Sequence, residues 1–155
     1  ACKRLVRMPT HAEKRLLPYT PEKLYNLVSD VEKYPDFLPW CIALRVRSRE
    51  VKMINADMII GFKVFREKFT TRVTLNPPRR IDVEYLDGPF KYLNNHWIFK
   101  PIDDGACEID FYVDFEFKSI LLQKAIGAVF NEAVQKMINA FEARAHRIYG
   151  NQLKT

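Results

Sequence analysis

The pattern that decides the fold lies in residues 107–150, which read CEIDFYVDFEFKSILLQKAIGAVFNEAVQKMINAFEARAHRIYG. Apolar and polar side chains alternate from Cys107 to Phe117, which predicts a strand with one face against a core and the other against water. After Ser119, a candidate helix N-cap, a helical apolar period begins and continues for about 30 residues to Gly150, a candidate C-terminal cap. The segment therefore predicts a strand followed by one long amphipathic helix.

The two-residue period recurs upstream, between residues 42 and 102. Candidate inner rows begin at Ile42, Ala56, Phe69, Ile81 and Leu93. Proline- and glycine-containing turns at 76–78, 87–89 and 103–105 separate several of them. With an extended segment at 13–17, the order predicts an α+β fold in which a curved antiparallel sheet of about five or six further strands wraps around the C-terminal helix.

Residues 30–41, DVEKYPDFLPWC, follow a short amphipathic helix that Thr20 and Pro21 are placed to begin. Pro35 and Pro39 prevent a helix from running through this segment. Its aromatic side chains therefore lie on irregular backbone that is suited to form the wall or mouth of a cavity. A gap between sheet and helix would be apolar, so an apolar ligand is the first hypothesis.

Length and charge limit the possible classes. At 155 residues the chain fits one domain, expected at 11–150 between a basic tail at 1–10 and a C-terminal tail at 151–155. Its apolar stretches are shorter than the roughly 20 residues of a membrane-spanning helix. The net charge of +6 favours contact with phosphates, on anionic lipid or on RNA, while DNA is not an expected partner.

Motifs of common enzyme classes are absent from the sequence, including GxGxxG, the Walker loop, HExxH and GxSxG. The histidines and cysteines lack metal-ligand spacing, so we interpret them as surface groups and as small buried residues, and expect neither a metal nor a required cofactor. The acidic row at 108–116 is interpreted as the solvent face of a strand. Asn95 and Glu67, in contrast, fall in phase with apolar rows, where a ligand oxygen would be one possible partner.

Four separated blocks carry a resemblance to a known family: PYTPEKLYNLV with DVEKYPDFLPWC (18–41), DGPFKYLNNHWIF (87–99), DFEFKS (114–119) and AFEARAHRIYG (140–150). In this order they resemble the coenzyme Q-binding proteins of the START-like superfamily, the polyketide cyclase/dehydrase and lipid-transport proteins. The superfamily also includes the ribosome-association toxin. The resemblance implies a helix-grip fold and a non-enzymatic chaperone that binds ubiquinone and supports respiration and quinone biosynthesis.

From the rows and the resemblance together we expect a ligand-binding surface of thirteen side chains. They are Phe37, Trp40, Met58, Ile60, Phe62, Phe69, Tyr85, Trp97, Phe111, Phe115, Ile126, Phe130 and Val134. The expected ligand is ubiquinone or a similar isoprenoid lipid, whose apolar tail gains free energy on leaving water. A transient anionic membrane surface would be approached through Lys3, Arg4 and Arg7 and through an exposed Phe37 and Leu38.

Two alternatives stay open from the sequence. The basic charge is compatible with a ribosome-binding regulator that contacts the large subunit and blocks subunit association. A polyketide cyclase ranks behind it, because no paired acid and base is visible. The expected location is the bacterial cytoplasm, peripheral to the inner membrane, with the matrix side of the mitochondrial inner membrane as the alternative.

Overall fold

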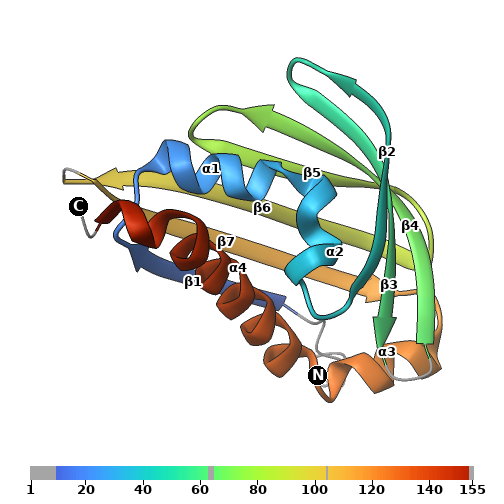
Figure 1. Ribbon diagram of the computed structural model, residues 1–155. Helices are drawn as coiled ribbons and strands as arrows, with labels where there is room; N and C mark the ends of the chain where they lie inside the picture. The colour runs from blue at the N-terminus through green and yellow to red at the C-terminus, as the bar shows by residue number, and fades with distance from the viewer. Residues whose placement is uncertain (1–9, 63–64, 104, 154–155) are drawn as a thin grey trace, which may run out of the picture.

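The computed structural model describes residues 10–62, 65–103 and 105–153. Lys3, Arg4 and Arg7 of the expected basic tail lie outside the described residues, as do the side chains of residues 62 and 151–153. Figure 1 shows a curved sheet with the C-terminal helix α4 running diagonally across it, and with α1 and α2 on the same side. The expected α+β arrangement is confirmed.

One antiparallel sheet forms the frame of the molecule, in the strand order β1-β7-β6-β5-β4-β3-β2. The strands are β1 (Thr10–Leu17), β2 (Cys41–Glu50), β3 (Met53–Phe62), β4 (Phe65–Asn76), β5 (Arg80–Asp87), β6 (Phe90–Ile102) and β7 (Ala106–Phe117). Consecutive strands from β2 to β7 pair with their sequence neighbours, and β1 adds to the free edge of β7. The first and last strands of this order are therefore the two edges of an open, curved sheet.

Strand alternation places apolar rows on the concave face, as the sequence predicts. Met58 pairs with both Leu44 and Phe69, so one inner row crosses three strands. Ile42 is the exception: it was expected on the inner row, but its side chain is 44% exposed. A register shift between Cys41 and Ala43 turns it outward, because a bulge changes the face of the inserted residue.

The segment between β1 and β2 forms three short helical pieces. Helix α1 (Pro21–Ser29) begins at Thr20, whose Oγ1 accepts a hydrogen bond from the Lys23 backbone N–H at 3.2 Å. A 3₁₀ turn, η2 (Val31–Lys33), and the single-turn helix α2 (Tyr34–Phe37) follow. Leu38 leaves the helix in an extended conformation, directly before Pro39. The prolines thus produce the irregular segment that the sequence predicts.

The C-terminal helical region is two helices, α3 (Ile120–Gly127) and α4 (Phe130–Leu153), so the expectation of one continuous helix is wrong. Helix α3 begins at Ser119, the expected N-cap, and tightens at its end, where the Val129 N–H donates to the Ile126 carbonyl at 3.0 Å. Gly127, with its low helix propensity, precedes the break. Gly150 does not end α4, because it lacks the positive φ of a glycine cap.

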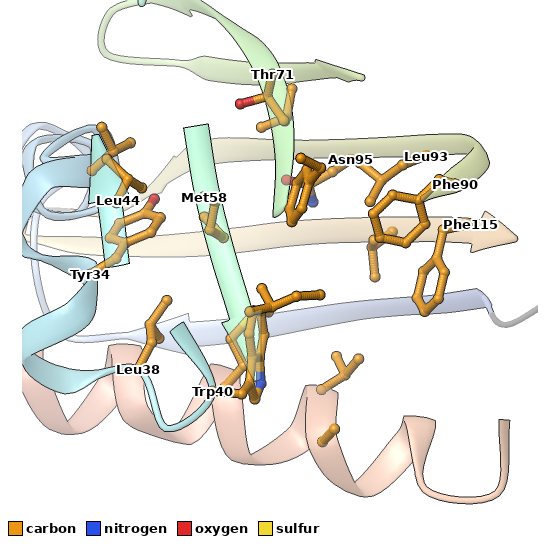
Figure 2. A pocket seen from close by; sticks show the side chains of 18 of the residues that line it. Tyr34, Leu38, Trp40, Leu44, Met58, Thr71, Phe90, Leu93, Asn95 and Phe115 are labelled. Carbon is orange, nitrogen blue, oxygen red and sulfur yellow. The ribbon is translucent and has the colours of Figure 1, made fainter. Parts of the chain in front are cut away.

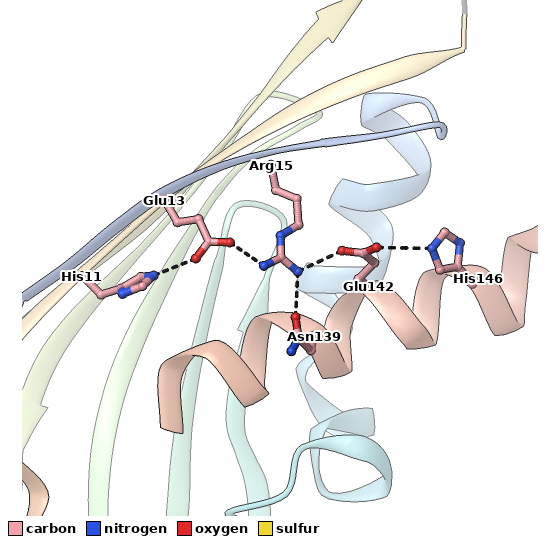
Figure 3. Close-up of polar contacts among 6 residues, drawn as sticks. All are labelled: His11, Glu13, Arg15, Asn139, Glu142 and His146. Atoms are coloured by element: carbon pink, nitrogen blue, oxygen red, sulfur yellow. Dashed lines mark hydrogen bonds and ion pairs between the residues drawn. The ribbon is translucent and has the colours of Figure 1, made fainter. Parts of the chain in front are cut away.

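A polar cluster joins β1 to α4 along one side of the molecule (Figure 3). The guanidinium of Arg15 contacts Glu13 on its own strand at 2.6 Å, and Glu142 and Asn139 on α4 at 2.8 and 3.0 Å. Burial by itself raises the pKa of Glu13, but the hydrogen bond from His11 and the charge of Arg15 outweigh burial and lower it. The Arg15–Glu142 ion pair and the Arg15–Asn139 hydrogen bond join α4 to the edge strand β1.

Candidate functional site

A cavity of about 220 Å³ lies between the concave face of the sheet, the α2–β2 segment and helices α3 and α4. Figure 2 shows its wall, in which side chains from the strands face those of Leu38 and Trp40 and the helix behind them. The wall is predominantly aliphatic and aromatic. Its residues are Val31, Tyr34, Leu38, Trp40, Leu44, Ala56, Met58, Ile60, Phe69, Thr71, Val73, Ile81, Val83, Phe90, Leu93, Asn95, Trp97, Phe111, Val113, Phe115, Phe117, Ile126, Phe130, Ala133, Val134, Met137 and Phe141.

Most of the side chains expected from the sequence are part of this wall. The structure brings together ten of the thirteen: Trp40, Met58, Ile60, Phe69, Trp97, Phe111, Phe115, Ile126, Phe130 and Val134. Trp40 comes from the segment between α2 and β2, and the other nine come from β3, β4, β6 and β7 and from both C-terminal helices. Their contact with a ligand stays a prediction.

Three expected residues are not among the cavity residues. Phe37 forms a T-shaped contact with Phe141 of α4, with ring centroids 5.2 Å apart, and the Arg144 guanidinium lies over the Phe37 ring, 5.1 Å from its centroid. Tyr85 lies behind Phe90, and its hydroxyl accepts the Phe90 backbone N–H at 3.0 Å. The Phe62 side chain is outside the described part of the structure.

The position of Leu38 also differs from the expectation. It was expected to be exposed beside Phe37 and available for a membrane, but its side chain is 5% exposed and faces the cavity. Phe37 is half-buried against α4. The α2–β2 segment therefore turns Leu38 into the cavity wall and packs Phe37 against α4.

Sequence reasoning missed several aromatic side chains of the wall, chiefly Phe90 and Phe141. Phe90 contacts four other rings, among them Phe69 at 5.2 Å and Phe117 at 4.6 Å. It is out of phase with Leu93, and a register shift between Phe90 and Tyr92 brings both to the inner face. The Gly88-Pro89 turn directly before Phe90 is the one local signal of such an irregularity.

Few polar groups reach the wall, and one of them lacks a partner within the described residues. The indole Nε1 of Trp40 is buried and makes no hydrogen bond there. In contrast, the Asn95 amide donates to the Tyr112 carbonyl at 2.8 Å, and the Tyr34 hydroxyl donates to the Val28 carbonyl. An unpaired buried donor is unfavourable by about 1–3 kcal/mol, so Trp40 marks the place where a ligand acceptor would be most favourable. Glu67, the other polar residue singled out in the sequence, is half-buried on β4 and is not part of the wall.

Burial makes the two cysteines of the described residues poor nucleophiles. Burial raises the pKa of the Cys41 and Cys107 thiols to about 11, which keeps both protonated at neutral pH. The described residues contain no group of three or more histidine, cysteine or acidic side chains placed to hold a metal ion. In chemical terms, the arrangement is suited to enclosing an apolar molecule.

Comparison with known proteins identifies the family. The family model for polyketide cyclase/dehydrase and lipid transport proteins matches residues 17–142. The chain belongs to this family. A ribosome association toxin RatA from Rickettsia prowazekii is 41% identical over 138 residues, which cover 86% of this chain and 94% of the toxin. The mitochondrial coenzyme Q-binding protein COQ10 homolog B of Xenopus laevis is 34% identical, over 92% of this chain and 60% of that protein.

Solved structures confirm the expected helix-grip fold of the START-like superfamily. The solution structure of an 18 kDa protein from Caulobacter crescentus is 42% identical, with a TM-score of 0.75 over 92% of this chain and 99% of the other. The Zhui aromatase/cyclase from Streptomyces sp. R1128 has a TM-score of 0.80 over 91% and 95% of the two chains. At 15% identity, this second likeness concerns the fold alone. Among the described residues, no helix combines the length and the apolar character needed to cross a membrane.

Proposed function

We propose that this protein binds ubiquinone, or a closely similar isoprenoid quinone, and carries it without chemical change in support of respiration and quinone biosynthesis. The apolar cavity between the sheet and α4 is the observation that carries the proposal. Transfer of an isoprenoid chain from water is favourable by roughly 25 cal/mol per Å² of apolar area, and the wall offers the matching surface. The name of the coenzyme Q-binding relative supports the same ligand class.

The size of the cavity sets how much ligand it encloses. A dry apolar cavity of about 150 Å³ is enough for one benzene molecule. The 220 Å³ here therefore accommodates a substituted ring or a short length of isoprenoid, but not both a ring and a long tail. We place the quinone ring inside the cavity and the remaining tail outside it, and expect affinity to increase little beyond the first few isoprene units.

We infer the placement of the ring from the Trp40 indole, a buried donor of the wall without a partner among the described residues. Trp40 Nε1 offers its N–H to a quinone carbonyl or methoxy oxygen, and the aromatic side chains around it offer faces and edges for stacking. A plain hydrocarbon of equal size would leave that N–H unpaired. The ligand class is therefore an apolar molecule with an oxygen acceptor at one end.

Intrinsic fluorescence gives a direct test, because both tryptophans of the chain, Trp40 and Trp97, are part of the wall. Purified protein, stripped of lipid with organic solvent and refolded, is titrated with ubiquinones of one, two and four isoprene units. Saturable quenching at one equivalent supports the proposal. Quenching that stays linear with concentration, together with no quinone in the solvent extract, would contradict it.

Ribosome association is a second candidate, favoured by the outer face of β2, β3 and β4. Leu44, Met58 and Phe69 pair with one another on the concave face, so the residues that alternate with them point outward. Five of these outward side chains are basic: Arg45, Arg47, Arg66, Lys68 and Arg72. The carboxylate among them, Asp57, is only 5% exposed and is already held by Arg47 at 2.7 Å and by Thr70 at 2.6 Å. This convex basic face is suited to RNA phosphates.

Sedimentation with large ribosomal subunits at rising salt tests this second candidate. The double variant Arg45→Glu/Arg66→Glu changes two exposed cations that form no ion pair with an acidic side chain in the described part of the chain. Lost sedimentation in this variant, with unchanged quinone quenching, would assign the two activities to opposite faces of the sheet. Sedimentation that the variant retains would exclude this face from ribosome contact.

A further inference from the structure

Helix α3 presents large apolar side chains to solvent. Ile120 is 74% exposed and Leu121 is 71% exposed, although both belong to a regular, capped helix. On its other side the helix buries Leu122 and contributes Ile126 to the cavity wall. Because one of these sides already packs on the protein, the exposed side requires a separate explanation.

The charged residues of this segment of the chain carry a single sign. Lys118 and Lys124 are exposed next to Ile120 and Leu121, and the sequence contains no acidic residue from 118 to 131. The preceding carboxylate, Glu116, is paired with Lys91 at 2.8 Å. We call Lys118, Ile120, Leu121 and Lys124 the α3 patch. Its combination of apolar side chains and lysines complements an interface of acyl chains and anionic headgroups.

The α3 patch is also close to the cavity along the chain. Ile126 of α3 and Phe130, the first residue of α4, both line the cavity, so the bend between the helices joins the patch to the wall. Figure 1 shows α3 at the end of the molecule, by the β3–β4 end of the sheet. A ligand nearly insoluble in water is taken up from a bilayer, and the α3 patch adjoins residues that line the cavity.

We propose that the α3 patch is the surface by which the protein docks on an anionic bilayer, with Ile120 and Leu121 entering the headgroup region and the lysines contacting lipid phosphates. This rests on the proposed function, because it supplies the route by which the quinone enters. A second copy of the chain fits the patch less well. Two apolar side chains fall far short of the roughly 800 Å² per partner that a stable dimer buries, and four lysines would meet across the two-fold axis.

Vesicle flotation tests the docking surface. Wild-type protein is mixed with vesicles of phosphatidylcholine alone, or with 40% phosphatidylglycerol, and compared with Ile120→Ser/Leu121→Ser and Lys118→Glu/Lys124→Glu. Val51→Ser is the matched control, because Val51 is 90% exposed in the β2–β3 turn, well away from α3. We expect anionic vesicles to bind wild type and control alike, and both double variants to lose about tenfold or more in partitioning.

Other outcomes separate this inference from the proposed function. Both double variants should still quench normally with quinone delivered in detergent, because none of the four changed side chains is part of the wall. Vesicle binding that persists in Ile120→Ser/Leu121→Ser, or that is absent from wild type, would overturn the docking surface. A wild-type dimer that the same variant dissociates would also overturn it, in favour of a self-interface. Docking without quinone binding would overturn the proposed function alone.

Discussion

Val134 offers a substitution for which stability and ligand binding should change in opposite directions. Its side chain is buried on α4 and faces the cavity. Val134→Phe adds roughly 50 Å³ of side chain, about a quarter of the 220 Å³ that is open. At ~24 cal/mol per Å³ of cavity removed, the filled space contributes up to about 1 kcal/mol to the free energy of unfolding.

The reverse change at the same position is the matched control. Val134→Ala removes two methyl groups from a buried site and enlarges the cavity, so it should lower the free energy of unfolding by about 2 kcal/mol. We expect the ligand-free Phe variant to be as stable as wild type or slightly more stable, and to bind quinone at least about tenfold more weakly. The Ala variant should be less stable and still bind.

Urea denaturation of the lipid-free variants measures stability, and tryptophan quenching measures binding. If the cavity were closed in solution by rearranged side chains, Val134→Phe would have no space to enter. Overpacking would then destabilise the protein by about 1–3 kcal/mol. That loss of stability, with quinone affinity unchanged, would refute both the cavity and its role.

Three further predictions concern single side chains. Trp40→Phe keeps an aromatic ring but removes the indole N–H together with the pyrrole part of the side chain, so quinone affinity measured through Trp97 fluorescence should fall about three- to tenfold. An unchanged affinity would show that the N–H does not anchor the ligand. Burial raises the pKa of Asp57, but hydrogen bonds from Thr70 and Arg47 and the charges of Arg47 and Lys68 outweigh burial and lower it below 3.8. The ionised Asp57 therefore stabilises the fold above its unfolded-state pKa, and this stabilisation is lost as pH falls through its folded-state pKa. The free energy of unfolding should consequently fall less with acid in Asp57→Asn than in wild type. Identical pH profiles of the two proteins would count against the pairing. In a Cys2→Ser background, Cys41 and Cys107 should react with thiol reagents at pH 7.5 only after unfolding, and rapid labelling of the folded protein would show that they are accessible.

Local chemistry explains which features could be predicted from the sequence. The alternation from Cys107 to Phe117 and the caps at Thr20 and Ser119 depend on neighbouring residues alone, and the structure shows each of them as predicted. The same alternation predicts most of the cavity-lining side chains of the strands. Once one row of a strand is known to face inward, the two-residue period tells which of its other side chains also face inward. The residues that line the cavity could therefore be predicted largely from which side chains of each strand face inward.

The features that were missed depend on contacts between distant segments. Register shifts at Cys41 and Phe90 reverse the face of single residues, and alternation cannot reveal where such shifts occur. The helix break after Gly127 lies within a continuous helical period of apolar residues, and the low helix propensity of that glycine is a weak signal beside such a period. Phe37 was misplaced because its partner, Phe141, is about a hundred residues away.

The contents of the cavity in protein purified without detergent provide the most direct measurement of the central claim. Mass spectrometry of a solvent extract should show an isoprenoid quinone approaching one equivalent in wild type, and much less in Val134→Phe prepared in parallel. An extract with no isoprenoid lipid above the level of the Phe variant, from protein that also fails to take up added quinone, would contradict the account.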